Sequence, residues 1–426
     1  MTRALALIDG EHYAPVIRDA LEALPYDFAA ALMLGGTEKL HGGEDYGVPV
    51  VRNLDAALAE LQPDAVVDLS DEPVLGPRDR LALASRVLAH GVPYIGADFR
   101  FDPPPLEPFR LPSLGIVGTG KRVGKTTTTG YVARRLSETR DVVVVSMGRG
   151  GPPEPQVAEG SPTVEQLLEL SRQGRHAASD YLEIAAVAGV ATVGCRRCGG
   201  GMAGATFDSN VDAGAKLAAA RGPDLVLFDG SGASLPPIAT DRRILVVGAH
   251  QDAAVMTGYL NAYRILTSDL VVVTMAEEGT PWSELRDAIR AVKPGIDVVA
   301  SVLRPRPAAP VAGRRVAFFT TAPEPIHDRQ AEHLRAEHGA EVVLVSGNLS
   351  RRDALGQDLE RAGDADVFVT EIKGAAIDVV AEAGAERGID VVFSDNDLLP
   401  LRDQPDLDEI LEQLAVTATQ LKTVRR

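Results

Sequence analysis

The chain is poor in sulfur and in aromatic side chains. It holds two cysteines and one tryptophan among 426 residues, and only 4% of its residues are aromatic. Two cysteines exclude a framework of several disulfides. Apolar residues make up 45% of the chain, which is typical of a globular protein, so the cores must consist of Ala, Val, Leu and Ile. The length predicts two or three domains.

Long hydrophobic runs are also missing, and positive charge is in deficit. No apolar stretch approaches the roughly 20 residues that cross a bilayer, and the N-terminal segment meets charged residues too early for a secretory signal. A net charge of −17 disfavours nucleic acid as a partner. We therefore expect a cytoplasmic protein that binds neither membranes nor nucleic acid.

The strongest motif is a glycine-rich loop that links an apolar run to a helix-compatible segment. It reads Gly118-Thr-Gly-Lys-Arg-Val-Gly-Lys-Thr126. Glycines let backbone N–H groups turn toward a polyphosphate, and the start of a helix adds unpaired donors. We expect Lys125 to reach the outer phosphates of ATP and the Thr126 hydroxyl to bind Mg²⁺. The predicted nucleotide-binding residues are Gly118, Thr119, Gly120, Lys121, Arg122, Val123, Gly124, Lys125, Thr126 and Thr127.

The loop departs from the strict P-loop pattern, which requires glycine where this chain has Thr119. Its length and its two ends resemble the loop of dethiobiotin synthetase-like ATP enzymes, from the P-loop branch that includes the nitrogenase iron protein and the ParA/MinD group. That branch often carries a second lysine at the place of Gly120. Here Lys121 comes one residue later, so the trans-acting role of that lysine is not transferred to this chain.

A second motif places a carboxylate at the end of another apolar run. Asp229 follows residues 225–228 and is followed by a Gly-Ser-Gly turn that contains Ser231. Beside a P-loop, such an aspartate binds Mg²⁺ directly or through water, and the glycines let the backbone approach the γ-phosphate. Thr126 and Asp229 are therefore the candidate metal ligands.

Several cationic side chains lie in glycine-rich loops directly after apolar runs of this acidic chain. Such positions favour a local pocket for more negative charge than ATP alone brings, although surface salt bridges and ordinary strand-end turns remain alternatives. An early histidine follows the first apolar run in the same way. The candidate substrate-binding residues are Arg149, Gly150, Arg196, Arg197, Ser231, Lys373 and His12. The candidate catalytic residues are Lys125, Asp229, Arg149 and Arg196.

The two cysteines form a Cys195-Arg-Arg-Cys198 motif. Such a pair can pack in a core, act in redox chemistry, or supply two of the four ligands that zinc requires. The sequence leaves these three interpretations open.

The apolar runs indicate an α/β protein with mostly parallel sheets covered by helices. Proline-rich segments at 102–105 and 304–310 divide the chain into three parts. We expect an N-terminal α/β domain (1–105), a P-loop core (106–308) whose continuously apolar strands are covered on both faces, and a C-terminal α/β region (309–426). The last part either packs on the core or extends its sheet.

Taken together, the motifs resemble the cyclic 2,3-diphosphoglycerate synthetase family over the whole chain. The resemblance implies an ATP- and Mg²⁺-dependent ligase that closes an intramolecular phosphoanhydride in 2,3-diphosphoglycerate and releases ADP and phosphate. It also implies a cytoplasmic homodimer. The residues that carry it are Ile8-Asp-Gly-Glu-His-Tyr13, the loop 118–126, Ser146-Met-Gly-Arg-Gly-Gly-Pro152, Gly194-Cys-Arg-Arg-Cys-Gly-Gly-Gly201, Phe228-Asp-Gly-Ser-Gly-Ala233, Glu371-Ile-Lys-Gly-Ala-Ala-Ile-Asp378 and Ser394-Asp-Asn396.

The implied chemistry requires concentrated positive charge. Two phosphate dianions about 4.5 Å apart repel by roughly 15 kcal/mol at an effective dielectric constant of 20. The hypothesis is that one substrate phosphate attacks the γ-phosphorus in line, after which the second attacks the activated phosphate and expels inorganic phosphate. Two other functions stay open: another dethiobiotin synthetase-like ligase acting on a carboxylate or amine, and a ParA-like nucleotide switch.

Overall fold

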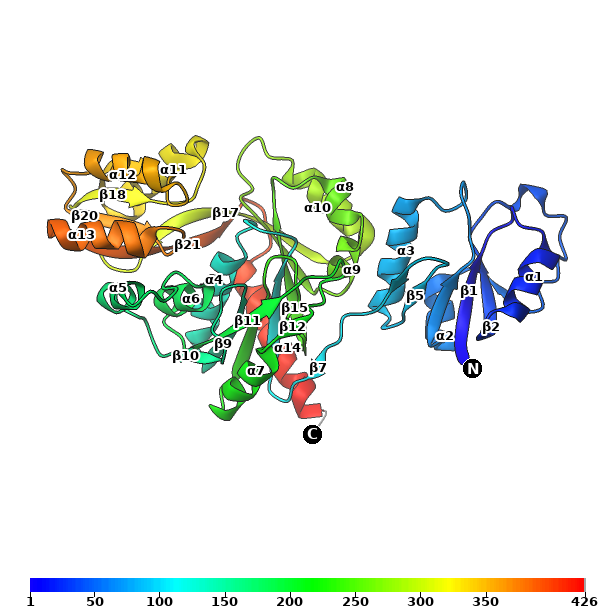
Figure 1. The fold of residues 1–426 in the computed structure, drawn as a ribbon. Helices are drawn as coiled ribbons and strands as arrows, with labels where there is room; N and C mark the ends of the chain where they lie inside the picture. Colours follow the sequence, from blue (N-terminus) through cyan, green and yellow to red (C-terminus); the bar gives the residue numbers. More distant parts are fainter. Residues whose placement is uncertain (425–426) are drawn as a thin grey trace.

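The computed structural model describes residues 1–424 and shows an α/β protein built around two mainly parallel sheets (Figure 1). The predicted fold class is confirmed. The smaller sheet has the order β3-β2-β1-β4-β5-β6, and its strands are parallel except for β6. Its elements are β1 (Thr2–Ile8), α1 (Ala14–Ala23), β2 (Tyr26–Met33), β3 (Val50–Val51), α2 (Leu54–Leu61), β4 (Ala65–Asp68), α3 (Pro77–Ala89), β5 (Tyr94–Ile95) and β6 (Arg100–Phe101).

The P-loop lies in the larger sheet, whose order is β10-β11-β9-β13-β8-β15-β16-β17 before it continues into the C-terminal part. The strands from β11 to β17 in this order run parallel. Its elements are β8 (Ser113–Gly118), α4 (Lys125–Ser137), β9 (Val142–Gly148), β10 (Gln156–Ala158), α5 (Val164–Arg172), α6 (Asp180–Ala188), β11 (Thr192–Cys198), β12 (Asp208–Ser209), α7 (Val211–Ala220), β13 (Leu225–Asp229), β15 (Arg242–Gly248), α8 (Ala253–Thr257), α9 (Asn261–Leu266), β16 (Leu270–Thr274), α10 (Trp282–Val292) and β17 (Asp297–Pro307). A small separate pair joins β7 (Glu107–Pro108) and β14 (Ile238–Ala239).

The C-terminal part extends this sheet. β17 pairs antiparallel with β21, and the order continues β21-β20-β18-β19, with parallel pairing among these four strands. The added elements are β18 (Arg315–Phe319), η2 (Glu324–Ile326), α11 (His327–His338), β19 (Glu341–Ser346), α12 (Arg352–Arg361), β20 (Val367–Glu371), the π-helix η3 (Ala376–Ala381), α13 (Glu382–Arg387) and β21 (Asp390–Pro400).

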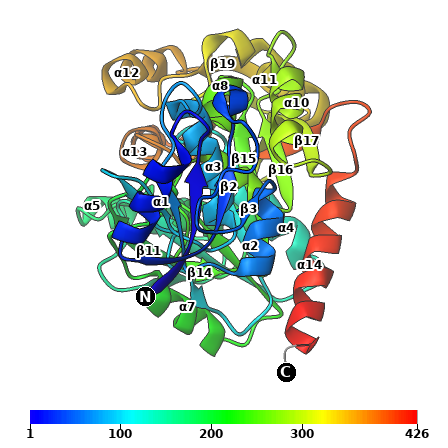
Figure 2. The same cartoon turned by 90° about the vertical axis from the view of Figure 1, so that its right-hand side faces the viewer.

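The last helix, α14 (Leu407–Val424), returns from the C-terminal part to the P-loop core, as its position at one side of the molecule in Figure 2 shows. Its buried side chains Leu411, Ala415 and Ala418 belong to the same apolar cluster as residues of β8 and α4. Tyr131 of α4 also donates a hydrogen bond of 2.8 Å to Asp408. The chain end therefore stabilises the helix that follows the P-loop.

The central strands are buried on both faces, as their apolar runs predict. Every residue of β8, β13 and β16 is buried. Aliphatic side chains fill these layers, and each one that is fully removed from water contributes about 1.5–3 kcal/mol. The strands are thus held rigidly while their carboxyl ends present loops to one edge of the sheet.

The N-terminal unit packs on the core through α3 (Figure 1). Val87 and Leu88 of α3 share one apolar cluster with Tyr263 and Ile265 of α9. The Ser85 hydroxyl also donates a hydrogen bond of 3.3 Å to the carbonyl oxygen of Tyr259. None of the helices in residues 1–424 is both long and apolar enough to cross a membrane.

Candidate nucleotide and phosphate site

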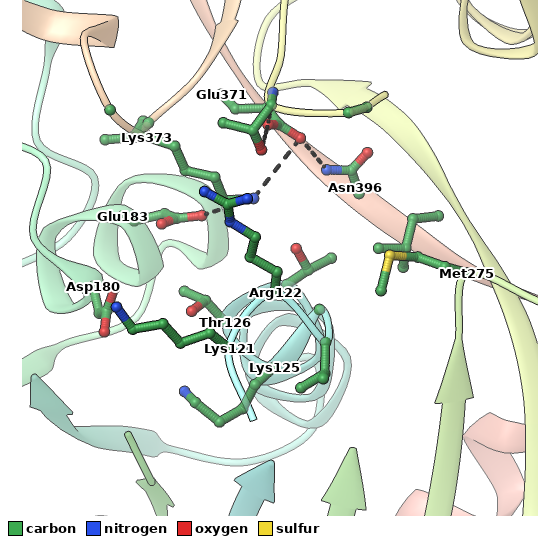
Figure 3. A pocket seen from close by; sticks show the side chains of 18 of the residues that line it. Lys121, Arg122, Lys125, Thr126, Asp180, Glu183, Met275, Glu371, Lys373 and Asn396 are labelled. Atoms are coloured by element: carbon green, nitrogen blue, oxygen red, sulfur yellow. Dashed lines mark hydrogen bonds and ion pairs between the residues drawn. The ribbon is translucent and has the colours of Figure 1, made fainter. Parts of the chain in front are cut away.

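A cavity of about 1050 Å³ opens where the loops after β8, β9 and β13 meet. α6, the loop after β16 and the C-terminal part complete its walls. Carboxyl ends of parallel strands meet at one edge of a sheet, and this is where open α/β sheets bind ligands. Figure 3 shows charged side chains from the P-loop, α6 and the C-terminal part directed into this space.

The P-loop forms the floor of the cavity. Residues 120–127 line it, and α4 begins at Lys125 directly after Gly124, whose φ of 74° favours glycine. Gly118 and Thr119 lie outside the lining, where the Thr119 hydroxyl donates a hydrogen bond of 2.6 Å to Gln251. The Thr126 side chain faces the cavity and makes no hydrogen bond to any residue in 1–424.

Lys125 and Asp229 form a buried ion pair behind this floor. The lysine Nζ donates to Asp229 Oδ1 at 2.6 Å, and Asp229 also accepts hydrogen bonds from Thr129 at 2.6 Å and Ser146 at 3.2 Å. Asp229 is fully buried, and burial raises the pKa of its carboxyl group, an effect that Lys125 opposes. Asp229 does not itself line the cavity, so a ligand reaches it only when Lys125 turns away.

Three cations of the cavity wall have no protein partner among the described residues. Lys121, Arg122 and Arg149 line the cavity and make no hydrogen bond or ion pair. The Arg149 guanidinium lies against the Gly-Ser-Gly turn, since a Cβ atom at Gly232 would meet its Nη2 at 2.9 Å. Gly150 and Ser231 line the same space. This end of the cavity therefore offers unneutralised positive charge.

Arg197 does not line the cavity and lies behind these unpartnered cations. It donates hydrogen bonds to the carbonyl oxygens of Gly199 at 2.5 Å and Ser231 at 2.9 Å. Burial and the nearby charge of Arg149 lower the pKa of its guanidinium. Arg197 thus positions the turn that carries Ser231.

Two predicted substrate residues lie outside the cavity lining. Arg196 is exposed, because the alternation of side chains along β11 sends it to the opposite face from Arg197. His12 belongs to the N-terminal sheet, where its Nδ1 lies 2.8 Å from Asp9 Oδ1. Neither Arg196 nor His12 therefore lines this cavity.

Both cysteines are free thiols. Cys195 is buried against α7, so closely that a Cβ atom at Gly214 would meet its Sγ at 2.2 Å, and burial raises the pKa of the thiol to about 12. Cys198 is exposed. No cluster of three or more His, Cys, Asp or Glu residues within 1–424 is arranged to hold a metal ion. Cys195 therefore has the environment of a packing residue.

Lys373 enters the cavity from the C-terminal part between two carboxylates (Figure 3). Its Nζ lies 3.7 Å from Glu183 Oε1 and 3.8 Å from Glu371 Oε1, and Asn396 donates to Glu371 at 2.8 Å. Burial lowers the pKa of Lys373, but the surrounding carboxylates outweigh it and raise the pKa overall. Burial raises the pKa of Glu183 to about 8, although Lys373 opposes the shift.

The sequence analysis missed the wall formed by α6, which supplies Asp180, Tyr181 and Glu183. One signal was available: Glu183 is an isolated acid inside the apolar segment Asp180–Ala188. A carboxyl group on an otherwise buried helix requires a polar partner, and the Lys373 ammonium provides it across the boundary to the C-terminal part. The sequence alone does not reveal which lysine this is.

Comparison with known proteins identifies the family of this chain. The chain matches three domains described as the N-terminal domain (residues 3–102), the P-loop domain (113–302) and the C-terminal domain (307–397) of cyclic 2,3-diphosphoglycerate synthetase. It is 52% identical to the cyclic 2,3-diphosphoglycerate synthetase of Rubrobacter xylanophilus, over 93% of this chain and 94% of that protein. The proteins of that name from Thermococcus onnurineus (46% identity, 92% and 94% covered) and Methanothermus fervidus (40%, 92% and 92%) are similar throughout.

These matches confirm the resemblance, and they do not favour a different dethiobiotin synthetase-like ligase or a ParA-like switch. They cover nearly the whole of both proteins and include the P-loop that forms the cavity floor. The chain therefore belongs to the cyclic 2,3-diphosphoglycerate synthetase family of ATP-dependent, P-loop enzymes.

Proposed function

We propose that this protein closes the phosphoanhydride ring of cyclic 2,3-diphosphoglycerate, using ATP and releasing ADP and inorganic phosphate. The observation that carries the proposal is the set of three unpartnered cations, Lys121, Arg122 and Arg149, around the P-loop cavity. An acidic protein that leaves three cations unpaired around one cavity has a site for a highly charged anion. Family membership identifies that anion as 2,3-diphosphoglycerate.

The residues support a two-step displacement. One substrate phosphate oxygen attacks the γ-phosphorus of ATP, so that the bond to ADP breaks and ADP leaves. An oxygen of the second substrate phosphate then attacks the activated phosphate, which closes the ring and expels the former γ-phosphate. Arg149 and Lys121 offset the repulsion between the two phosphates, and Lys125 stabilises charge on the transferred group.

Mg²⁺ fits the groups that are present. Thr126 offers a hydroxyl oxygen without a partner, and Asp229 offers a carboxylate once Lys125 has turned toward phosphate. Mg²⁺ prefers oxygen ligands, takes one or two from the protein and keeps waters or phosphate oxygens for the rest. When bound, it would neutralise charge on the outer phosphates of ATP.

The family resemblance also supports a homodimer in the cytoplasm, and the net charge of −17 disfavours a nucleic-acid partner. We further propose the division of the chain at about residues 105 and 308. On this division the cavity belongs to the second and third parts together, because Lys373 and Glu371 line it from beyond residue 309.

The test is turnover with and without 2,3-diphosphoglycerate. ATP hydrolysis should rise sharply when the substrate is added, and phosphorus NMR should show the cyclic phosphoanhydride. Lys125→Ala should lower turnover at least about 1000-fold, while Lys216→Ala, at an exposed position of α7, should not. Circular dichroism checks folding, since Lys125→Ala leaves Asp229 buried without its cation. Wild-type turnover in Lys125→Ala, or ATP hydrolysis without the cyclic product, would refute the proposal.

A further inference from the structure

The two ends of the cavity differ in free charge. The order of the sheet puts β13 and β9 on one side of β8, and β15, β16 and β17 on the other. The first side presents Arg149. The second presents Glu277 after β16, and this carboxylate is already paired with Arg304 at 2.5 Å and Arg329 at 2.6 Å. A polyphosphate is therefore attracted to the first side, and the uncharged end of a nucleotide is directed to the second.

The second side contains a buried amide without a partner. Gln330 of α11 is only 2% exposed and lines the cavity, yet its side chain makes no hydrogen bond to any residue in 1–424. Ile326 lies four residues earlier, at the end of η2, and also lines the cavity, as i,i+4 neighbours on one face do. Buried amides are nearly always hydrogen-bonded, so this one points to a ligand.

A strained residue lies on the same side. Met275 directly follows β16 and lines the cavity with a φ of 55°, in the left-handed region that non-glycine residues rarely adopt. Strain of this kind concentrates at ligand sites. Its thioether can also contact the edge of an aromatic ring. Met275 and Gln330 are independent observations, one of backbone geometry and one of hydrogen bonding.

We propose that the adenine base of ATP binds between Met275 and the surface formed by Ile326 of η2 and Gln330 of α11, and that the Gln330 amide hydrogen-bonds to the edge of the base. An amide offers one acceptor and one donor, which match the adenine N6 amino group and a neighbouring ring nitrogen. The inference rests on the proposed function only for the identity of the nucleotide. Its consequence is that the C-terminal part selects the base.

The experiment uses three probes in calorimetric titrations with Mg²⁺: ADP, purine riboside 5′-diphosphate, which lacks the amino group, and inorganic pyrophosphate, which lacks the nucleoside. Gln330→Met keeps the side-chain volume and removes the polar atoms. It should weaken ADP binding about five- to tenfold, to near the affinity of purine riboside diphosphate. Pyrophosphate binding should stay within about twofold. Gln413→Met, at an exposed position of α14, is the matched control and should change none of the three.

Unchanged ADP affinity in Gln330→Met would overturn the inference, as would equal weakening of all three probes, because that result indicates general damage to the cavity. Weaker binding of 2,3-diphosphoglycerate with normal ADP binding would also overturn it, since the amide would then serve the other substrate. Formation of the cyclic product by the wild-type protein separates these failures from failure of the proposed function. A variant with normal ADP affinity and normal product refutes the base assignment alone.

Discussion

The two sheets of this protein end in similar residues but in different environments. Both place carboxylates at the carboxyl ends of parallel strands, Asp9 and Asp68 in the small sheet and Asp229 and Glu371 in the large one. Asp9 accepts hydrogen bonds from His12 and from the backbone of Asp71. Asp68 is likewise satisfied, as it accepts from Tyr94 at 2.6 Å and lies 3.0 Å from Arg80. The small sheet leaves no such carboxylate without a partner.

The loops differ in space as well as in charge. In the small sheet a Cβ atom at Gly10 would lie 2.3 Å from the carbonyl oxygen of Gly36, so backbone fills the gap between the loops. In the large sheet the nearest atom to a Cβ at Gly120 is 3.6 Å away, and a cavity opens above. A polar cluster after a strand is therefore a binding site only where cations remain unpaired and the backbone leaves room.

The largest expected change in KM separates two arginines of the large sheet. Arg149→Ala removes a cavity cation, and the loss of charge-assisted hydrogen bonds to phosphate should raise the KM for 2,3-diphosphoglycerate about 10- to 100-fold. Arg196→Ala changes an exposed residue outside the cavity lining and should leave KM within about twofold. Steady-state kinetics at saturating ATP measure both. Equal effects of the two substitutions would mean that the difference in their placement has no functional consequence.

A smaller effect concerns pH. Burial raises the pKa of Glu183 from its ordinary value of 4.5 to about 8. Below pH 8 the carboxyl group is neutral, and above it the ionised group adds negative charge beside the bound anion. The KM for 2,3-diphosphoglycerate should therefore rise several-fold between pH 7 and 9, and Glu183→Gln should remove this rise. An identical pH profile in the two proteins would exclude Glu183 as the titrating group.

The raised pKa of Glu183 also makes the free energy of unfolding depend on pH. The carboxyl group of Glu183 ionises more readily in the unfolded chain, so its contribution to the free energy of unfolding is fully present below about pH 4.5. It is lost as pH rises toward 8. In Glu183→Gln that part of the decline should be absent from denaturant titrations, which gives a readout independent of catalysis.

The sequence was sufficient for the elements defined by local chemistry. Buried parallel strands carry continuous apolar runs, and the P-loop carries its glycines and Lys125, so both could be located from the order of residues. Arg149 could be placed near the loop because the carboxyl ends of neighbouring parallel strands meet. For the strands, the P-loop and Arg149, the local sequence pattern and the sheet topology predict the same position.

The sequence was insufficient where a contact joins distant segments. Arg196 and Arg197 are adjacent and chemically identical, and only the register of β11 decides which of them reaches the Ser231 turn. Gln330 and Glu183 lie in helices with no motif. Gln330 reaches the cavity because β17 pairs with β21 and carries the C-terminal part over the P-loop, and the same arrangement brings Lys373 to Glu183 of α6. Antiparallel pairing between two distant strands leaves no local signature.

The smallest expected effect tests the closed end of the small sheet. His12→Ala removes one of several hydrogen bonds to Asp9, while the backbone amides of Glu11 and Asp71 still donate at 3.0 and 2.7 Å. The free energy of unfolding should fall by about 0.5–1.5 kcal/mol, and kcat and KM should stay within about twofold. Tyr13→Ala, at a neighbouring side chain that is 75% exposed, should change neither quantity.

Only stability should respond to His12→Ala, because the hydrogen bonds to Asp9 stabilise the folded small sheet. Burial raises the pKa of Asp9, but the hydrogen bonds from His12 and the backbone outweigh burial and lower the pKa overall. The cluster therefore contributes its full stability above the ordinary pKa of the carboxyl group, and this contribution is lost as pH falls through the lowered pKa. A tenfold loss of kcat/KM in His12→Ala with an unchanged melting temperature would reverse this argument. The small sheet would then hold a functional site despite its satisfied carboxylates, and unpaired cations would no longer distinguish the two sheet edges.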